Sequence, residues 1–239
     1  MKKICFITSS RADFGMVNEL LKESINHKNI KTYLIISGNH NDKIYGKSLK
    51  EIKIDKKVII KRIFFSQRNN DNLSVGLSFS KYLKKYFILL KKLNPNVFVA
   101  FGDRYEILAA TLSAYILRIP IAHIAGGEKT AGSLDDGYRH SITKLSYLHF
   151  PTSKTYKKRL IQLGEDPRMI FNYGSLNRQK IAITKYLSRF ELEKKFKLNF
   201  LNKNILLTYH PENVENNGNF KNLSLILNCL KKLKKTVVI

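Results

Sequence analysis

Acidic side chains are enriched in one short segment, from Gly126 to Thr143 (GGEKTAGSLDDGYRHSIT). Two adjacent glycines open this segment, and the side chains in it that could do chemistry are Glu128, Asp135, Asp136, Arg139 and His140. Asp103 ends a separate apolar stretch, VFVAFGD. Carboxylates that surround one carbon centre can remove a proton from one side and return it from another. We therefore predict acid–base chemistry for the acids of these two stretches.

Each of these acids also has a purely structural interpretation. Asp103 could cap the helix that follows it, since aspartate is favoured at that position. Glu128 could be an exposed acid in a loop. Asp135 and Asp136 could begin a helix, where negative charge complements the helix dipole. The residue types alone leave these alternatives open.

Basic residues beside predicted strand ends are candidates for binding an anion. Arg11 follows the first predicted strand, where a phosphate or a uracil would meet the start of a helix, and arginine can hold phosphate through two hydrogen bonds. Arg139 and His140 could equally pair with nearby acids as structural groups. His210, at the end of LLTYH, is a single histidine and has a structural interpretation too. Two further histidines lie inside apolar strands and are expected in or near the core: His123 and His149.

Short apolar runs alternate with helical patterns along most of the chain. Strands are predicted at residues 2–8, 31–38, 57–65, 97–103, 119–127, 147–153 and 169–175. Helical spacing of apolar residues predicts helices at 16–27, 77–93, 104–118, 138–146 and 154–164. This alternation predicts an α/β fold, a doubly wound parallel sheet covered on both faces.

Polar clusters follow five of these strands, at residues 9–11, 37–40, 102–104, 126–128 and 174–175. In open parallel sheets, ligands bind outside the carboxyl ends of the strands. We therefore expect these clusters to share one rim of the sheet and to form one site there.

The character of the sequence changes near residue 177. A charged helical connector follows, then a new strand in KNILLTYHPENV, a helix and the start of a strand, TVVI. We predict an N-terminal α/β domain at 1–180 that carries most of the catalytic acids. Residues 181–239 are predicted to be the connector and the beginning of a second, truncated α/β domain that binds nucleotide.

Composition narrows the class of protein. Lys and Arg outnumber Asp and Glu by 43 to 18, a formal charge of +25, but the lysines are spread along the chain and no nucleic-acid motif occurs. The cysteines, Cys5 and Cys229, lie at opposite ends, so neither a disulfide framework nor a metal site is predicted. The G-x-G-x-x-G pattern is absent, which disfavours NAD. We expect a cytoplasmic protein without a membrane span or a cofactor.

Taken in order, these motifs resemble the hydrolysing UDP-N-acetylglucosamine 2-epimerase family. Within it they resemble the branch that makes N-acetylmannosamine, or its diacetamido deoxy relatives, for sugars of the sialic-acid and legionaminic-acid type. The matching stretches cover essentially the whole chain, at residues 7–15, 37–40, 101–106, 119–144, 171–176 and 209–213.

The resemblance implies a two-domain fold of the glycosyltransferase-B type, with substrate between the domains. It also implies a two-step reaction. The nucleoside diphosphate leaves by elimination across C1 and C2, giving a 2-acetamidoglycal. Water then adds at C1 while C2 is reprotonated on the opposite face, so that a free sugar with inverted C2 is released.

The resemblance also implies roles for individual residues. The acidic catalytic positions match Asp103, Glu128 and either Asp135 or Asp136, of which we prefer Asp136. His210 matches the catalytic histidine. The remaining positions are predicted to bind substrate: Arg11, His40, Arg104, Gly127, Arg139, Ser175 and Glu212.

One departure from the family pattern limits the prediction. Family members continue well past residue 239, through a Gly-Asn-Ser-Ser-Ser type loop and an acidic ribose-binding residue, and neither occurs here. We therefore expect negligible turnover from these 239 residues alone, and a homo-oligomer at full length. Two rival functions remain: a glycosyltransferase of the same fold, and a basic module that binds nucleic acid.

Overall fold

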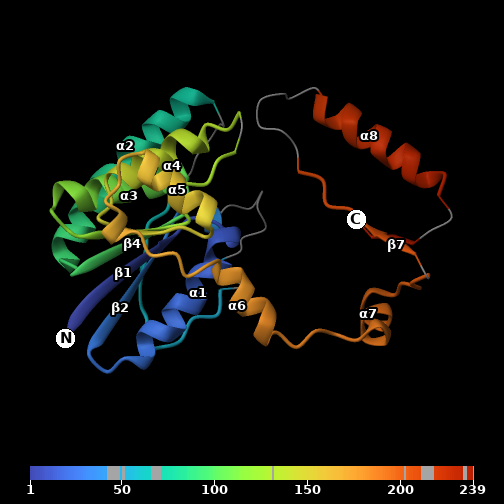
Figure 1. The fold of residues 1–239 in the computed structure, drawn as a ribbon, viewed down its shortest axis with the longest axis horizontal. Coiled ribbons are helices and arrows are strands. Elements are labelled where there is room, and N and C mark those ends of the chain that lie inside the picture. The colour runs from blue at the N-terminus through green and yellow to red at the C-terminus, as the bar shows by residue number, and fades with distance from the viewer. Residues whose placement is uncertain are drawn as a thin grey trace. The chain divides into compact units, whose positions relative to one another are not determined.

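The computed structural model describes residues 1–41, 49, 52–65, 71–130, 132–201, 203–210, 218–233 and 236–238. The chain divides into two compact units, Met1–Ala182 and Ile183–Ile239. Figure 1 draws the elements of both units, with the N-terminal one in blue to orange.

A six-stranded sheet forms the centre of the first unit, in the order β3-β2-β1-β4-β5-β6 (Figure 1). Its strands are β1 (Lys2–Thr8), β2 (Ile30–Ile36), β3 (Ile59–Arg62), β4 (Val97–Phe101), β5 (Ile121–Ile124) and β6 (Leu148–Phe150). All neighbouring pairs are parallel. The predicted doubly wound parallel sheet is therefore confirmed. The strand order reverses between β1 and β4, and such a switch point is where open α/β sheets bind ligands.

Helices cover both faces of this sheet. They are α1 (Arg11–Asn26), α2 (Asn72–Leu93), α3 (Tyr105–Ile116), α4 (Asp135–Lys144), α5 (Lys154–Gln162) and α6 (Leu176–Ile183), with short 3-10 turns at η1 (Gly38–Asn41) and η3 (Pro167–Met169). Successive residues of β1 alternate between the faces: Cys5 and Ile7 pack with α2, α3 and α4, whereas Phe6 packs with α1. The strands read as continuous apolar runs because both of their faces are buried.

Two helices begin earlier in the sequence than predicted. Helix α1 starts at Arg11 instead of residue 16, because Ser10 and Asp13 form a reciprocal capping box at its start. Helix α4 starts at Asp135 instead of residue 138, so Asp135 and Asp136 occupy its first turn. The predicted strand at 169–175 is wrong: this stretch contains the end of η3 and a single bridge between His149 and Ile170.

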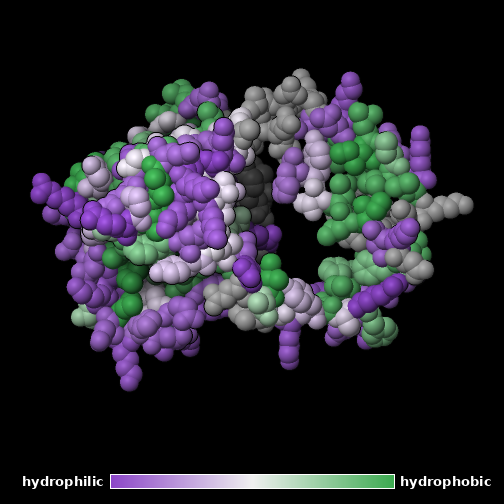
Figure 2. Space-filling view, in the orientation of Figure 1, coloured by the Kyte–Doolittle hydropathy of each residue, from purple (hydrophilic) through white to green (hydrophobic). Residues whose placement is uncertain are grey.

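Among its described residues, the second unit holds two helices and a pair of strands. They are α7 (Arg189–Phe196), β7 (Asn204–Leu206), α8 (Gly218–Lys231) and β8 (Thr236–Val238), and β7 and β8 pair in parallel. Several large apolar side chains of this unit are exposed, among them Phe190, Leu206 and Phe220. Figure 2 shows broad green areas on the second unit, whereas hydrophilic residues cover much of the visible face of the first unit.

Candidate active site

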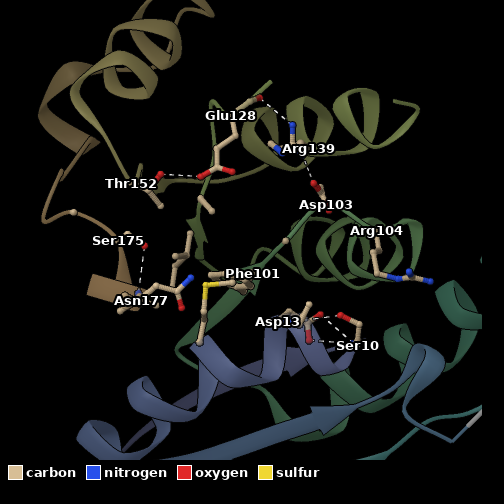
Figure 3. Close-up of a pocket in the computed structure, with 17 residues that line it drawn as sticks. Ser10, Asp13, Phe101, Asp103, Arg104, Glu128, Arg139, Thr152, Ser175 and Asn177 are labelled. Atoms are coloured by element: carbon tan, nitrogen blue, oxygen red, sulfur yellow. Dashed lines mark hydrogen bonds and ion pairs between the residues drawn. The ribbon is translucent and has the colours of Figure 1, made fainter. Parts of the chain in front are cut away.

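A cavity of about 330 Å³ lies at the carboxyl ends of the central strands. Its wall comes from the β1–α1 loop, the β4–α3 loop, the segment after β5, and residues 174–177 at the start of α6 (Figure 3). The cavity therefore occupies the switch point of the sheet. Four of the five polar clusters predicted to share one rim contribute residues to its wall, those near residues 9–11, 102–104, 126–128 and 174–175.

Arg139 organises the acidic part of this wall. Its Nη2 pairs with the carboxylate of Asp103, and its Nη1 pairs with Asp136 and donates to the backbone carbonyl of Glu128 at 3.0 Å. Only 6% of the Arg139 side chain is exposed. One buried guanidinium thus ties together the β4–α3 loop, the segment after β5 and the first turn of α4. Arg139 therefore pairs with nearby acids, as its structural interpretation from the sequence predicted.

Asp135 and Asp136 are adjacent, yet their environments move their pKa values in opposite directions. Partial burial, followed by the charge of Asp103, raises the pKa of Asp135. For Asp136, burial alone would raise the pKa, but the Thr130 N–H and the Arg139 guanidinium together lower it. Thr130 N donates to both Asp136 carboxylate oxygens, at 2.9 and 3.1 Å. Asp136 is therefore fixed as a carboxylate, and Asp135 is the member of the pair that holds a proton more readily.

Glu128 and Asp103 both line the cavity but contact different partners. The Glu128 carboxylate accepts the hydroxyl of Thr152 at 2.7 Å, and Figure 3 shows it turned toward Thr152, whereas the Asp103 carboxylate lies beside Arg139. Asp103 does not cap α3, because Arg104 occupies the N-cap position and makes no side-chain capping bond. The simple capping interpretation of Asp103 is therefore wrong.

Gly127 has a packing role and is not among the residues that line the cavity, and its predicted contact with substrate stays a prediction. A Cβ at this position would lie 2.7 Å from the backbone oxygen of Tyr156 on α5, and φ is +80°. Gly102 and Gly174 also have positive φ, +89° and +90°, but a Cβ there would meet nothing within 4 Å. Both line the cavity, so these two glycines leave open space beside its wall. Ala125, also in the wall, adopts φ of 63°, which costs about 1–2 kcal/mol for an L residue.

The β1–α1 loop is held by Asp13, which the sequence analysis did not select. Its carboxylate accepts the N–H groups of Ser9 and Ser10, both at 3.0 Å, and the hydroxyls of Ser9 at 2.9 Å and Thr8 at 2.5 Å. These amides would otherwise face an anion at the start of α1. The Ser10–x–x–Asp13 spacing was the available signal. Arg11 begins α1 and is exposed, and it is not among the residues that line the cavity.

Arg104 lines the cavity, but its guanidinium extends away from Glu128 and Asp103 (Figure 3). Its Nε and Nη2 donate to the two carboxylate oxygens of Glu106, at 3.2 and 3.0 Å. Glu106 is fully buried, and the sequence analysis missed it. Although burial acts against protonation, Glu106 raises the pKa of Arg104. The pair is therefore a fixed ionic contact at the edge of the cavity.

The other predicted binding residues have different placements. His40 is fully buried and its Nε2 lies 2.9 Å from the Thr8 hydroxyl, so the structure does not bring it to the cavity wall as predicted. Burial lowers the pKa of His40, against the opposing charge of Asp13. Ser175 does line the cavity, and its hydroxyl accepts the Asn177 N–H at 3.3 Å.

Two predicted residues belong to the second unit. His210 is exposed and follows β7, and Glu212 lies outside the described residues. Their catalytic and binding roles stay predictions.

Within the described part of the chain, no three His, Cys, Asp or Glu side chains are grouped so that they could hold a metal ion. Among the same residues, no helix combines the length and the apolar character that a bilayer span requires.

Comparisons with known proteins identify the family of the chain. Residues 22–239 match the model of the UDP-N-acetylglucosamine 2-epimerase family, and the chain belongs to this family. The resemblance inferred from the sequence motifs is thereby confirmed.

Curated relatives resemble the whole chain. It is 35% identical over 238 residues to the GDP/UDP-N,N'-diacetylbacillosamine 2-epimerase (hydrolyzing) of Campylobacter jejuni, covering 100% of this chain and 62% of the relative. It is 34% identical to the polysialic acid biosynthesis protein P7 of Escherichia coli, covering 99% and 60%. The chain thus spans about three fifths of the length of these relatives.

Solved structures share the fold. The UDP-GlcNAc 2-epimerase of Neisseria meningitidis bound to UDP-GlcNAc superposes with a TM-score of 0.78 at 22% identity, over 98% of this chain and 64% of that one. The UDP-GlcNAc 2-epimerase of Methanocaldococcus jannaschii in complex with UDP-GlcNAc and UDP superposes with a TM-score of 0.73 at 22% identity, again over 98% of this chain and 64% of that one.

Proposed function

We propose that this protein acts as a hydrolysing sugar-nucleotide 2-epimerase. It would convert a UDP-linked 2-acetamido sugar and water to the free 2-epimeric sugar and UDP. The observation that carries the proposal is the presence of the Asp103 and Glu128 carboxylates on the wall of one cavity, at the switch point of the sheet. Membership of the epimerase family supports the same chemistry.

The proposed reaction has two steps. A carboxylate removes the C2 proton while the bond between C1 and the diphosphate oxygen breaks, so that UDP leaves and a 2-acetamidoglycal remains. Water then adds to C1, and a carboxyl group returns a proton to the opposite face of C2. Two carboxyl groups from different loops suit this sequence, because one can accept a proton while the other donates. Asp103 and Glu128 are the two groups proposed.

The neighbouring acids support this pair in different ways. Arg139 and Thr130 keep Asp136 ionised, so that Asp136 stabilises the position of Arg139 and, through it, of Asp103. Partial burial and the charge of Asp103 raise the pKa of Asp135, so Asp135 can hold a proton close to this pair. We therefore propose Asp136, the acid preferred from the sequence, as a supporting residue, and Asp135 as the more suitable proton carrier.

The charge of the cavity favours the sugar over the diphosphate. Asp13, Asp103 and Glu128 all line it, and the guanidinium donors of Arg139 already serve protein oxygens. Carboxylates accept hydrogen bonds from sugar hydroxyls and amides but repel phosphate oxygens. We propose that the sugar ring enters this cavity and that the diphosphate lies outside it, within reach of exposed Arg11. For His210 and Glu212 we keep the roles that the resemblance implies, catalysis for His210 and substrate binding for Glu212.

For the sugar itself we propose a 2,4-diacetamido-2,4,6-trideoxy hexose, with N-acetylglucosamine as the alternative. The Campylobacter relative bears the name of an enzyme for such a sugar. Met16, Ile124 and Leu176 give the cavity apolar wall, which suits acetamido methyls and a 6-deoxy carbon.

The test is UDP release in the absence of any acceptor sugar. The chain is assayed alone and extended by the C-terminal part of the Campylobacter relative that it does not span. Each is incubated with UDP-diacetamidotrideoxyhexose or UDP-N-acetylglucosamine, and proton NMR follows UDP and the free 2-epimeric sugar. We expect conversion by the extended chain, and loss of at least about a hundredfold in Asp103→Asn or Glu128→Gln.

Asp166→Asn, on the exposed surface at η3, is the matched control and should leave the rate unchanged. The proposal would be contradicted if a folded extended chain released no UDP from either substrate. UDP release that required an acceptor sugar would point to a glycosyltransferase instead.

A further inference from the structure

His123 connects the sheet to the helix that carries the acidic residues. It lies on β5, is fully buried, and its Nδ1 is 3.1 Å from the Thr143 hydroxyl on α4. Burial, and after it the neighbouring His149, lowers the pKa of His123 to about 3. The ring is therefore neutral at physiological pH, and its contact with Thr143 is a hydrogen bond between neutral groups.

Thr143 lies one helical turn after Arg139. Residues four apart share a helix face, and both Thr143 and Arg139 are buried. The hydrogen bond from His123 to Thr143 therefore constrains the face of α4 from which Arg139 reaches Asp103. Asp103 belongs to the separate β4–α3 loop, so the Arg139–Asp103 pair depends on where α4 lies against the sheet.

The contact is also tightly enclosed. A Cβ at Gly126 would lie 3.0 Å from His123 Nδ1 and 3.1 Å from Thr143 Oγ1. Gly126 begins the segment that carries Glu128, whose backbone carbonyl accepts from Arg139. Gly126 therefore packs closely against both partners of this hydrogen bond, and a larger residue there would have to displace one of them by a few tenths of an ångström.

We propose that His123 is a positioning residue for the reaction: through Thr143 it sets the place of α4, and thereby the geometry in which Arg139 holds Asp103. This inference rests on the proposed function for its catalytic meaning. Its structural core, a coupling between Thr143 and Asp103, can be measured without substrate.

The measurement is a double-mutant cycle in urea unfolding. Thr143 and Asp103 bond to different partners, His123 and Arg139, so independent residues would show additive effects. We expect Thr143→Val to reduce the stability lost in Asp103→Asn, because α4 no longer presents Arg139 to Asp103 correctly. Thr143→Ser, which keeps the hydroxyl, should restore the full effect.

The matched control is Thr111→Val. Thr111 is equally buried, and its hydroxyl donates only within α3, to Ile107 O at 2.8 Å. Its effect should add to that of Asp103→Asn. Should Thr143→Val fail to fold, His123→Asn and His123→Gln carry the test, because the Asn amide can occupy the place of Nδ1 whereas the Gln amide extends past it. His123→Asn should then be additive with Asp103→Asn, whereas His123→Gln should show coupling to it.

The inference would be overturned if Thr143→Val and His123→Gln were additive with Asp103→Asn, or if Thr111→Val coupled as strongly. In an active protein, Thr143→Val should lower kcat with little change in KM, since small displacements at reacting groups cost large factors in rate. Coupling without any activity in the wild type would refute the proposed function and leave the structural link intact.

Discussion

Replacement of Arg139 by methionine is the sharpest perturbation of this site. Arg139→Met keeps most of the volume of the side chain but removes the charge that pairs with Asp103 and Asp136 and the donor to Glu128 O. Removing one partner of a buried ion pair costs about 3–5 kcal/mol, because the other charge is left buried and uncompensated. Here the two carboxylate side chains keep 27% and 19% exposure, so water can partly replace the guanidinium. We therefore expect a loss near the lower limit, about 3 kcal/mol in the free energy of unfolding.

The assay is urea unfolding at pH 7, followed by far-UV circular dichroism because the chain has no tryptophan. Arg139→Lys keeps the charge but cannot reach three acceptors in a fixed plane, so it should fall between wild type and Arg139→Met. Arg168→Met is the matched control, since Arg168 forms an exposed ion pair with Asp166 and its side chain is 84% exposed. It should not shift the unfolding midpoint. If Arg139→Met cost no more than Arg168→Met, the role of Arg139 as the organising charge would be refuted.

Three further predictions concern neighbouring residues. Gly127→Ala should cost about 2–4 kcal/mol in unfolding free energy, because φ is positive and the new Cβ would meet Tyr156 O. Gly102→Ala should cost only about 1–2 kcal/mol, because φ is positive there but a Cβ would meet nothing. Equal losses would contradict the packing argument. Asp136→Asn should destabilise at pH 7. Because the folded-state pKa of Asp136 is lowered, its contribution is complete above the ordinary aspartate pKa of about 4 and is lost as the pH falls from there through the folded-state pKa, so the difference from wild type should shrink below about pH 4. Urea titrations at several pH values would show a pH-independent difference if the pairing were absent. Glu106→Gln should cost about 2 kcal/mol in unfolding free energy, less than the loss of a fully buried pair, because 32% of the Arg104 side chain is exposed. Glu19→Gln, which removes one partner of an exposed pair, should change the melting temperature little. Similar shifts in melting temperature for both variants would count against a buried ionic contact.

The layout of the first unit could be predicted from sequence because both faces of its sheet are buried. Buried parallel strands read as unbroken apolar runs, and the helices between them keep a clear 3.6-residue spacing. The predicted strand at 169–175 was wrong because its aromatic residues have another role: Phe171 and Tyr173 stack with Phe150, and the segment makes only an isolated bridge, at Ile170. Local pattern does not distinguish these two uses of aromatic residues.

The acids of the site could be chosen from sequence, but their partners could not. Asp103, Glu128 and Asp136 stand at strand ends or helix starts, which sequence reveals. That Arg139 joins them depends on a contact between segments 36 residues apart. Gly127 was assigned to substrate because its constraint, the backbone of α5, is a tertiary contact invisible in the local sequence. Asp13 and Glu106 were missed because a single buried acid in a helical first turn resembles an ordinary cap.

The measurement closest to the central claim is the position of deuterium in the product. The extended chain is incubated with the UDP-linked sugar in D2O, and the released sugar is analysed by NMR and mass spectrometry. The account predicts one deuterium at C2 in every 2-epimeric product molecule, and no exchange when Asp103→Asn and Glu128→Gln are combined. A product whose C2 keeps its original hydrogen would contradict proton transfer by these carboxylates.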